Sequence, residues 1–248
     1  MLRTFRSELF KMTTTRATKV LLGFAVLLPV VIYVLTLIYG FDGGEMGSPA
    51  VVNIASGAPL VALLLGVIGV MCATQEYSQG TIRITLVATP NRQRVYFAKL
   101  LTTLYIAVFS TAVLIGLSLI ATVIVLKVRG VQFELIGNDA RVLLSFFVLT
   151  AVVALFGFSL GLIFKSGPGA ISATLLWPTI AESMVFGLLS AATTHNFFRW
   201  APIQNGFQLV SEFRFDDYNS WNVSALLFAG FVAVFAVVGA SLFMKRDA

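Results

Sequence analysis

Six long apolar runs constrain this chain more than any other feature of its sequence. They cover residues 20–41, 51–74, 100–126, 142–164, 170–192 and 223–244. The hydrocarbon core of a bilayer is about 30 Å thick, so a helix that crosses it needs about 20 mostly apolar residues. Each run is long enough, and the sequence therefore predicts six membrane-spanning helices.

Composition excludes an ordinary soluble domain. Hydrophobic residues make up 58% of the 248 residues and charged residues 11%, whereas about a quarter of the residues of a soluble domain are charged. The expected fold class is therefore all-α, a single polytopic integral membrane domain over residues 1–248. The net charge of +6 comes from Lys and Arg between the apolar runs, where they flank a membrane and form no surface for nucleic acid.

The distribution of basic residues predicts the orientation of the chain. Most of the 17 Lys and Arg residues lie in the N-terminal segment, the second and fourth connections and the C-terminal segment. Short loops rich in Lys and Arg favour the cytoplasmic side of a membrane. Both termini are therefore expected in the cytoplasm, in agreement with an even number of spans.

The first nineteen residues have the pattern of a helix that lies in the headgroup plane. Their apolar residues share one helical stripe and their basic residues fall off it. The stripe consists of Leu2, Phe5, Leu9 and Met12. The alternative is a short basic flank whose periodicity is accidental.

The last outer connection, residues 193–221, is long and aromatic. Pro202 and Gly206 interrupt it, and aromatic rings favour the membrane surface. We expect one or two short helices there, partly re-entrant, since non-helical backbone can enter a membrane only where protein or a water-filled cavity satisfies its amides. A plain aromatic anchor belt is the alternative.

Two glycines of the fourth run, Gly157 and Gly161, have the spacing G-x-x-x-G. This spacing allows the backbones of two helices to approach closely. We interpret it as a packing face within the chain and not as a dimer contact.

The sequence lacks the motifs of most enzymes. Cys72 is its single cysteine and His195 its single histidine, so histidine or cysteine metal clusters and a Ser-His-Asp triad have too few members. A glycine-rich phosphate loop is also absent, because Phe164 stands before Lys165 where that motif needs glycine. We therefore expect no enzyme, no catalytic residues, no metal site and no cofactor in this chain.

The connection over residues 75–99 predicts two short helices joined by a turn. Gly80 ends the second span, Thr81 caps the next turn, and Thr89 with Pro90 begins the following helix. Ile82 and Leu86 share one helical face. The connection is therefore expected to form a compact amphipathic structure that is suited to docking.

This connection resembles the cytoplasmic loop of the ABC-2 type permeases, the membrane subunits of type V ABC exporters. The resemblance rests on E-x-x-x-G-T, an aliphatic stretch, P-x-R and a downstream lysine, here Glu76, Gly80, Thr81, Leu86, Pro90, Arg92 and Lys99. It implies that the loop couples to a separate ATPase subunit, which binds the ATP. It also implies an interfacial first helix, six spans, and a location in a bacterial inner membrane beside a second permease copy or a sister chain.

The resemblance assigns the ATPase-coupling role to eight residues, which are Glu76, Gly80, Thr81, Ile82, Arg83, Ile84, Leu86 and Pro90. On this interpretation Glu76 pairs with a base of the partner or with Arg83, and Ile82, Ile84 and Leu86 supply buried contact. Arg92, Arg94 and Lys99 are expected to face anionic headgroups.

Glu182 is the one charged residue inside the six runs. A charge at mid-bilayer costs about 2 to 3 kcal/mol, so it is expected to face the bundle interior or a cavity. One hypothesis places it on a substrate pathway with Trp177 and Met184; the other makes it a hydrogen-bonded carboxyl that pins two helices.

The spans offer aliphatic and aromatic surface with little charge. The sequence therefore favours ATP-driven export of a hydrophobic or amphipathic compound, such as a drug, an antibiotic or a lipid-like molecule, as in multidrug efflux. Two alternatives stay open, a proton-coupled secondary transporter that uses Glu182 and a non-transporting immunity or scaffold subunit.

Overall fold

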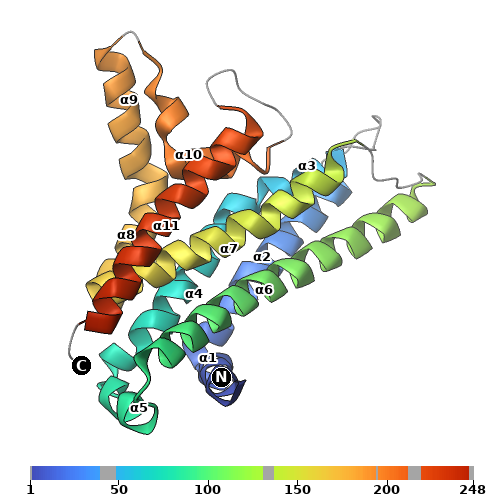
Figure 1. The fold of residues 1–248 in the computed structure, drawn as a ribbon. Helices are drawn as coiled ribbons and strands as arrows, with labels where there is room; N and C mark the ends of the chain where they lie inside the picture. Colours follow the sequence, from blue (N-terminus) through green and yellow to red (C-terminus); the bar gives the residue numbers. More distant parts are fainter. Residues whose placement is uncertain (1, 40–48, 131–136, 194, 212–218, 246–248) are drawn as a thin grey trace.

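The computed structural model describes residues 2–39, 49–130, 137–193, 195–211 and 219–245, and within these ranges every regular element is a helix (Figure 1). Six helical stretches are long and apolar enough to cross a membrane. The all-α class and the six predicted spans are therefore confirmed.

The spans keep the order of the apolar runs. They are α2 (Arg16–Tyr39), α3 with α4 (Pro49–Ser56 and Ala58–Ser78), α6 (Arg92–Val128), α7 (Asp139–Phe164), α8 with η1 and α9 (Gly167–Leu176, Trp177–Ala181 and Glu182–Ala192), and α11 (Trp221–Lys245). Four shorter helices complete the fold, α1 (Leu2–Thr14), α5 (Ile82–Ala88), η2 (Phe197–Trp200) and α10 (Pro202–Gln208).

Two of the spans are not continuous α-helices. The second is divided at Gly57, because Pro59 in the first turn of α4 lacks the N–H group that would continue the hydrogen bonds of α3. In the fifth, a π-helical turn at Trp177–Ala181 surrounds Pro178. A proline within a helix removes one backbone hydrogen bond, and a wider turn accommodates the gap.

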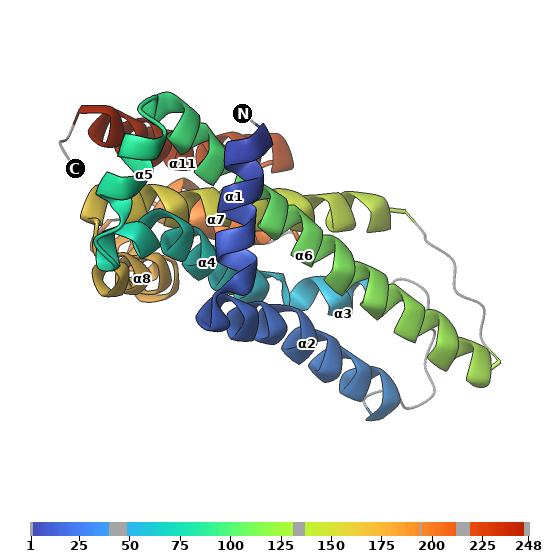
Figure 2. The same ribbon diagram turned by 90° about the horizontal axis from the view of Figure 1, so that it is seen from below.

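The centre of the molecule is the contact between α4 and α7. A Cβ atom added to Gly157 would lie 2.0 Å from the carbonyl oxygen of Gly66, and one added to Gly69 would lie 2.2 Å from that of Ala154. The two backbones therefore touch, which confirms that the G-x-x-x-G spacing serves packing within the chain. The other spans surround this pair (Figures 1 and 2).

The segments predicted to be cytoplasmic meet at one end of the bundle, which we call the α5 end. Gln75 donates a hydrogen bond of 2.8 Å to Thr15, the ammonium of Lys165 lies 5.3 Å from the ring centroid of Tyr77, and the start of α6 hydrogen-bonds to the last turn of α11. The N-terminus, α5 and the end of α11 accordingly lie together in Figure 1.

At the α5 end, α1 crosses the first turns of α6 (Figure 2). Met12 is buried in the core, whereas Arg3, Arg6 and Phe10 are exposed. The predicted interfacial helix is therefore a separate element with one packed face.

The connection predicted to be on the outer side contains two short helices, η2 and α10, and α10 lies between α9 and α11 (Figure 1). Asn205 of α10 is fully buried and accepts a hydrogen bond of 2.7 Å from the Ser224 hydroxyl of α11. The segment is thus folded onto the bundle as expected. Residues 212–218 of the predicted aromatic segment lie outside the described residues.

Candidate functional site

A tight turn at Gly80 positions the predicted coupling helix. Gly80 has a φ of +67°, a left-handed conformation that favours glycine, and the N–H of Thr81 donates to the Glu76 carbonyl at 2.9 Å. Thr81 occupies the N-cap position of α5, although its side chain makes no capping hydrogen bond. The chain thus reverses beside the end of α4 and presents α5 at the surface.

The predicted coupling residues divide into an inward and an outward set. Ile82 and Leu86 pack against the core of this chain. Ile84 and Val87 are 70% and 84% exposed, and Arg83 is exposed on the same helix. The apolar surface that α5 offers to a partner is therefore made by Ile84 and Val87 instead of Ile82.

Four charged side chains, Glu8, Lys11, Glu76 and Lys99, form a closed ring beside α5, and we call them the ion-pair ring. Lys99 Nζ lies 2.7 Å from Glu8 Oε2 and 3.1 Å from Glu76 Oε2. Lys11 Nζ lies 2.6 Å from Glu8 Oε1 and 2.7 Å from Glu76 Oε1. Each ammonium bridges both carboxylates, so the ring joins α1, α4 and α6.

Because three of the four side chains in the ion-pair ring are buried, their charges must be paired with one another. Glu8, Glu76 and Lys99 are 3%, 5% and 2% exposed, and buried charges are tolerated only when they are paired. Burial alone would lower the pKa of Lys11, but hydrogen bonds to Glu76 and Glu8 and the charge of both carboxylates raise it above 10.5. Lys11 therefore stays charged at neutral pH, and its contribution to stability is lost only as the pH rises above that value.

The coupling helix is attached to this ring. The Thr85 hydroxyl of α5 donates to Glu76 Oε1 at 2.8 Å. A cavity of about 270 Å³ lies next to the ring and is lined in part by Thr81, Ile84 and Thr85. A displacement of α5 therefore acts directly on a carboxylate that α1 and α6 share.

The predicted headgroup role of Lys99 is wrong. α6 begins at Arg92, about two turns before the predicted span, so Lys99 lies on the packed face of a helix and its ammonium is buried. For Glu76 the structure supplies Lys11 and Lys99 of this chain as counter-ions, where the sequence predicts a base of the partner or Arg83.

The predicted helix start at Thr89 and Pro90 is also wrong. Asn91 is the N-cap of α6, and its side-chain oxygen accepts a hydrogen bond of 3.1 Å from the N–H of Arg94. An asparagine in this position satisfies a backbone donor that a helix start leaves free. Pro90 lies exposed in the link between α5 and α6.

Comparison with protein families places these features in a known group. The model of the family described as "ABC-2 family transporter protein" matches residues 4–176. This chain belongs to that family. The match extends from α1 to α8 and so includes α5 and the ion-pair ring. A comparison with curated proteins finds no match.

Two residues of the ring in this ABC-2 protein, Glu8 and Lys11, have no predicted site role from the sequence, and a third, Lys99, has a predicted role that is wrong. Glu8 is 91 residues from Lys99 in the chain, and no local spacing indicates that contact. One signal was present, because Glu8 is four residues before Met12 and so adjoins the apolar stripe of α1. An acid that becomes buried beside such a stripe needs a counter-ion.

The second predicted site of the ABC-2 protein, around Glu182, lies beyond the matched residues. Glu182 is fully buried, and its Oε1 accepts hydrogen bonds from the N–H groups of Ile203 at 2.8 Å and Gln204 at 3.1 Å. Gln204 in turn donates to the carbonyl oxygen of Pro178 at 2.8 Å. Glu182 thus joins the fifth span to the first turn of α10, as the pinning hypothesis predicts.

The two other residues of the predicted substrate pathway, Trp177 and Met184, have different surroundings. Trp177 stacks on Phe231 of α11 with 6.3 Å between ring centroids, and Met184 is exposed. The Trp177 side chain also lies within hydrogen-bonding reach of the Glu182 carboxyl, so the structure brings one of these two residues beside Glu182.

Proposed function

We propose that this ABC-2 family protein is the permease subunit of an ATP-driven exporter, with its α5 end in the cytoplasm of a bacterial cell. A separate ABC ATPase binds and hydrolyses ATP, and two permease chains, identical or sister, form the membrane part. The observation that carries the proposal is a short helix with exposed apolar residues that is braced from inside by buried ion pairs.

The exposed residues of α5 support ATPase docking. Ile84 and Val87 lie at the end of the bundle where basic segments gather. An apolar patch at this position is better covered by protein than by water. Because Thr85 holds α5 to the ion-pair ring, a movement of the bound ATPase is transmitted to α1, α4 and α6 together.

The surface of the spans supports the proposed class of cargo. The fifth span exposes apolar side chains, among them Ile180, Met184 and Leu188, and its charged residue is buried and hydrogen-bonded. Such a surface suits a hydrophobic or amphipathic compound. Flexible methionine and aromatic side chains accommodate varied apolar shapes.

The test of ATPase docking uses the permease with candidate ABC ATPases from the same genome. Ile84→Asp with Val87→Asp is expected to abolish co-purification and the stimulation of ATP hydrolysis, because a charge in an apolar contact is left unpaired. The matched control is Val128→Asp, at the opposite end of α6, where the side chain is also 84% exposed. Intact co-purification in the double variant would refute the docking assignment.

The alternatives are separated by transport in reconstituted vesicles. The proposal predicts uptake of a fluorescent amphipathic cation that requires ATP and the ATPase. Transport driven by a pH gradient alone would favour the secondary transporter, and no transport with either energy source would favour the immunity or scaffold subunit.

A further inference from the structure

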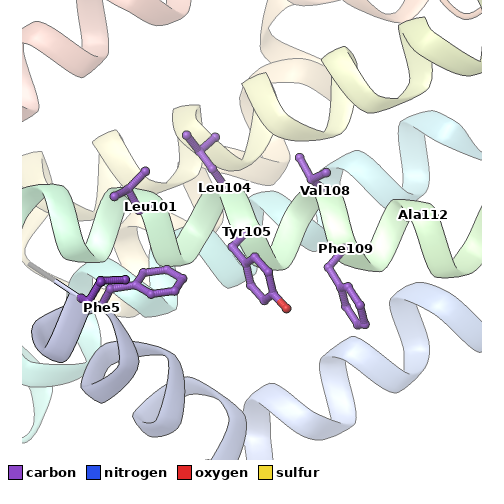
Figure 3. A pocket seen from close by; sticks show the side chains of 8 residues that line it. Phe5, Leu101, Leu104, Tyr105, Val108, Phe109 and Ala112 are labelled. Atoms are coloured by element: carbon purple, nitrogen blue, oxygen red, sulfur yellow. The ribbon is translucent and has the colours of Figure 1, made fainter.

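Two apolar grooves flank the crossing of α1 over α6. The larger, about 720 Å³, is lined by Leu2 and Phe5 of α1 and by residues of α6 from Leu101 to Ala112 (Figure 3). The smaller, about 410 Å³, lies between α1, α2 and α6 and includes Gly23. A Cβ atom added to Gly23 would meet nothing within 4 Å, so this groove is open.

A stack of aromatic rings separates the grooves. Phe5 of α1 meets Tyr105 edge to face with 6.0 Å between centroids, and Tyr105 stacks on Phe109 at 5.8 Å. Tyr105 and Phe109 line both grooves. The result is one ridge with an apolar channel on each side.

The length of the larger groove matches one leaflet. The stretch of α6 from Leu101 to Ala112 rises about 16 Å, and half of the hydrocarbon core is about 15 Å thick. The groove ends near the middle of α6 and is crossed at its start by α1.

Two exposed basic residues of α1 are chain neighbours of the residues that line the larger groove. Arg3 and Arg6 follow Leu2 and Phe5 on α1 and are exposed. No described carboxylate pairs with either guanidinium. Cationic groups at headgroup level attract anionic lipid, whereas a neutral hydrophobic cargo has no need of them.

From these observations we propose that the ridge binds one anionic diacyl phospholipid. Its two acyl chains occupy the two grooves on either side of Tyr105 and Phe109, and its phosphate lies against Arg3 and Arg6. The bound lipid would complete the packing between α1, α2 and α6 next to the ion-pair ring.

The test uses the full chain in phosphatidylcholine nanodiscs with a trace of phosphatidylglycerol that carries a photoreactive diazirine in one acyl chain. Labelling is expected to concentrate on the stretch from Leu101 to Ala112. Unlabelled phosphatidylglycerol is expected to compete on the order of tenfold better than phosphatidylcholine, as two basic side chains near a phosphate imply.

Two sets of variants test the two parts of the site. Ala112→Phe with Val108→Phe should reduce the labelling several-fold by filling the larger groove, while Val123→Phe, on exposed α6 surface outside both grooves, should not. Arg3→Gln with Arg6→Gln should remove the headgroup preference, whereas Arg16→Gln with Lys19→Gln, which removes the same charge, should retain it. Thermal unfolding confirms that each variant is folded.

Three results would overturn the proposal. Uniform labelling along the exposed face of α6 would indicate ordinary surrounding lipid, and equal effects of the two arginine and lysine sets would refute a headgroup site. Cross-linking of Ala112→Cys between two copies would show that a second chain occupies the groove. The labelling experiment contains no ATPase, so its result does not depend on whether the proposed export is correct.

Discussion

A carboxyl group can be fully buried in a membrane protein when backbone donors face it. Glu182 accepts two N–H groups from the first turn of α10 through one oxygen atom. The first N–H groups of a helix have no partner within that helix. The same contact therefore satisfies one oxygen of an acid in the fifth span and the start of a short helix, α10.

Substitution of Glu182 separates this structural role from a proton-carrying one. Glu182→Gln keeps a carbonyl oxygen for both N–H groups, so stability and ATP-driven transport should be close to those of the parent. Glu182→Ala should lower the free energy of unfolding by about 1–3 kcal/mol, because buried donors lose their acceptor. Thermal unfolding and vesicle transport measure the two effects. Loss of transport in the Gln variant at unchanged stability would contradict the pinning role.

The ion-pair ring predicts a different pattern for Lys99. Lys99→Met leaves two buried carboxylates to share the single ammonium of Lys11 and should destabilise the protein by about 3–5 kcal/mol. Adding Glu76→Gln restores the charge balance of the ring. The loss of unfolding free energy in the double variant should therefore be smaller than the sum of the losses in the two single variants. The measurement is a thermal double-mutant cycle in detergent.

Exposed Lys245 provides the control for this cycle. Lys245→Met should leave the unfolding temperature unchanged, because an exposed ammonium loses no buried partner. Strict additivity of Lys99→Met and Glu76→Gln would mean that the ring is not an energetic unit.

Sequence analysis recognised Glu182 and Glu76 as unusual residues but found few of their partners. An acid within an apolar run is conspicuous by itself, whereas Lys99 is conspicuous only once α6 is known to begin at Arg92. The contact of Lys99 with Glu8 depends on how α1 crosses α6, which is a property of the tertiary fold. Residue type therefore indicated a buried charge, and only the packing of helices identified its counter-ion.

Among the elements, the pair α4 and α7 has the closest contact that the glycines reveal. Gly69 and Gly157 leave no room for a methyl group. In a membrane, where lipid is as apolar as the side chains, close backbone packing is a main source of helix association. The stability of the bundle should therefore depend strongly on these glycines.

Gly157→Ala tests this dependence. The added methyl would lie 2.0 Å from the Gly66 carbonyl oxygen, and forcing the helices apart should cost about 1–3 kcal/mol. Gly116→Ala and Gly230→Ala are matched controls, since each lies within a span and has nothing within 4 Å. They should stabilise the protein slightly or leave it unchanged, because alanine favours a helix. Equal unfolding temperatures for all three variants would refute the tight contact.

The sequence predicts the six spans of this fold but not the interruptions within two of them. The six spans follow from apolar length alone, because the thickness of a bilayer fixes the length of a helix. The division at Gly57 and the π-helical turn at Pro178 do not follow, since a proline within an apolar run is compatible with a kink, a break or a wider turn. Neighbouring helices decide between these outcomes.

At the scale of the whole molecule, the contacts at the α5 end predict accessibility from one side of the membrane. Gln93→Cys and Ser220→Cys place exposed thiols at the α5 end and near the start of α11. A membrane-impermeant maleimide should modify the first only in inside-out vesicles and the second only in right-side-out vesicles. The parent is the control, since its Cys72 is buried. Modification of both from the same side would contradict the six-span topology.

The attachment of α5 through Thr85 also bears on how such transporters diversify. The ring is assembled from α1, α4 and α6, and α5 adds one hydrogen bond to it. Apart from this bond, α5 is held by Ile82 and Leu86, which pack against the core. The segment can therefore be exchanged where the incoming sequence keeps apolar residues at these two positions. Grafting the stretch from Gly80 to Pro90 of a sister permease, with threonine retained at position 85, should redirect this chain to a foreign motor subunit.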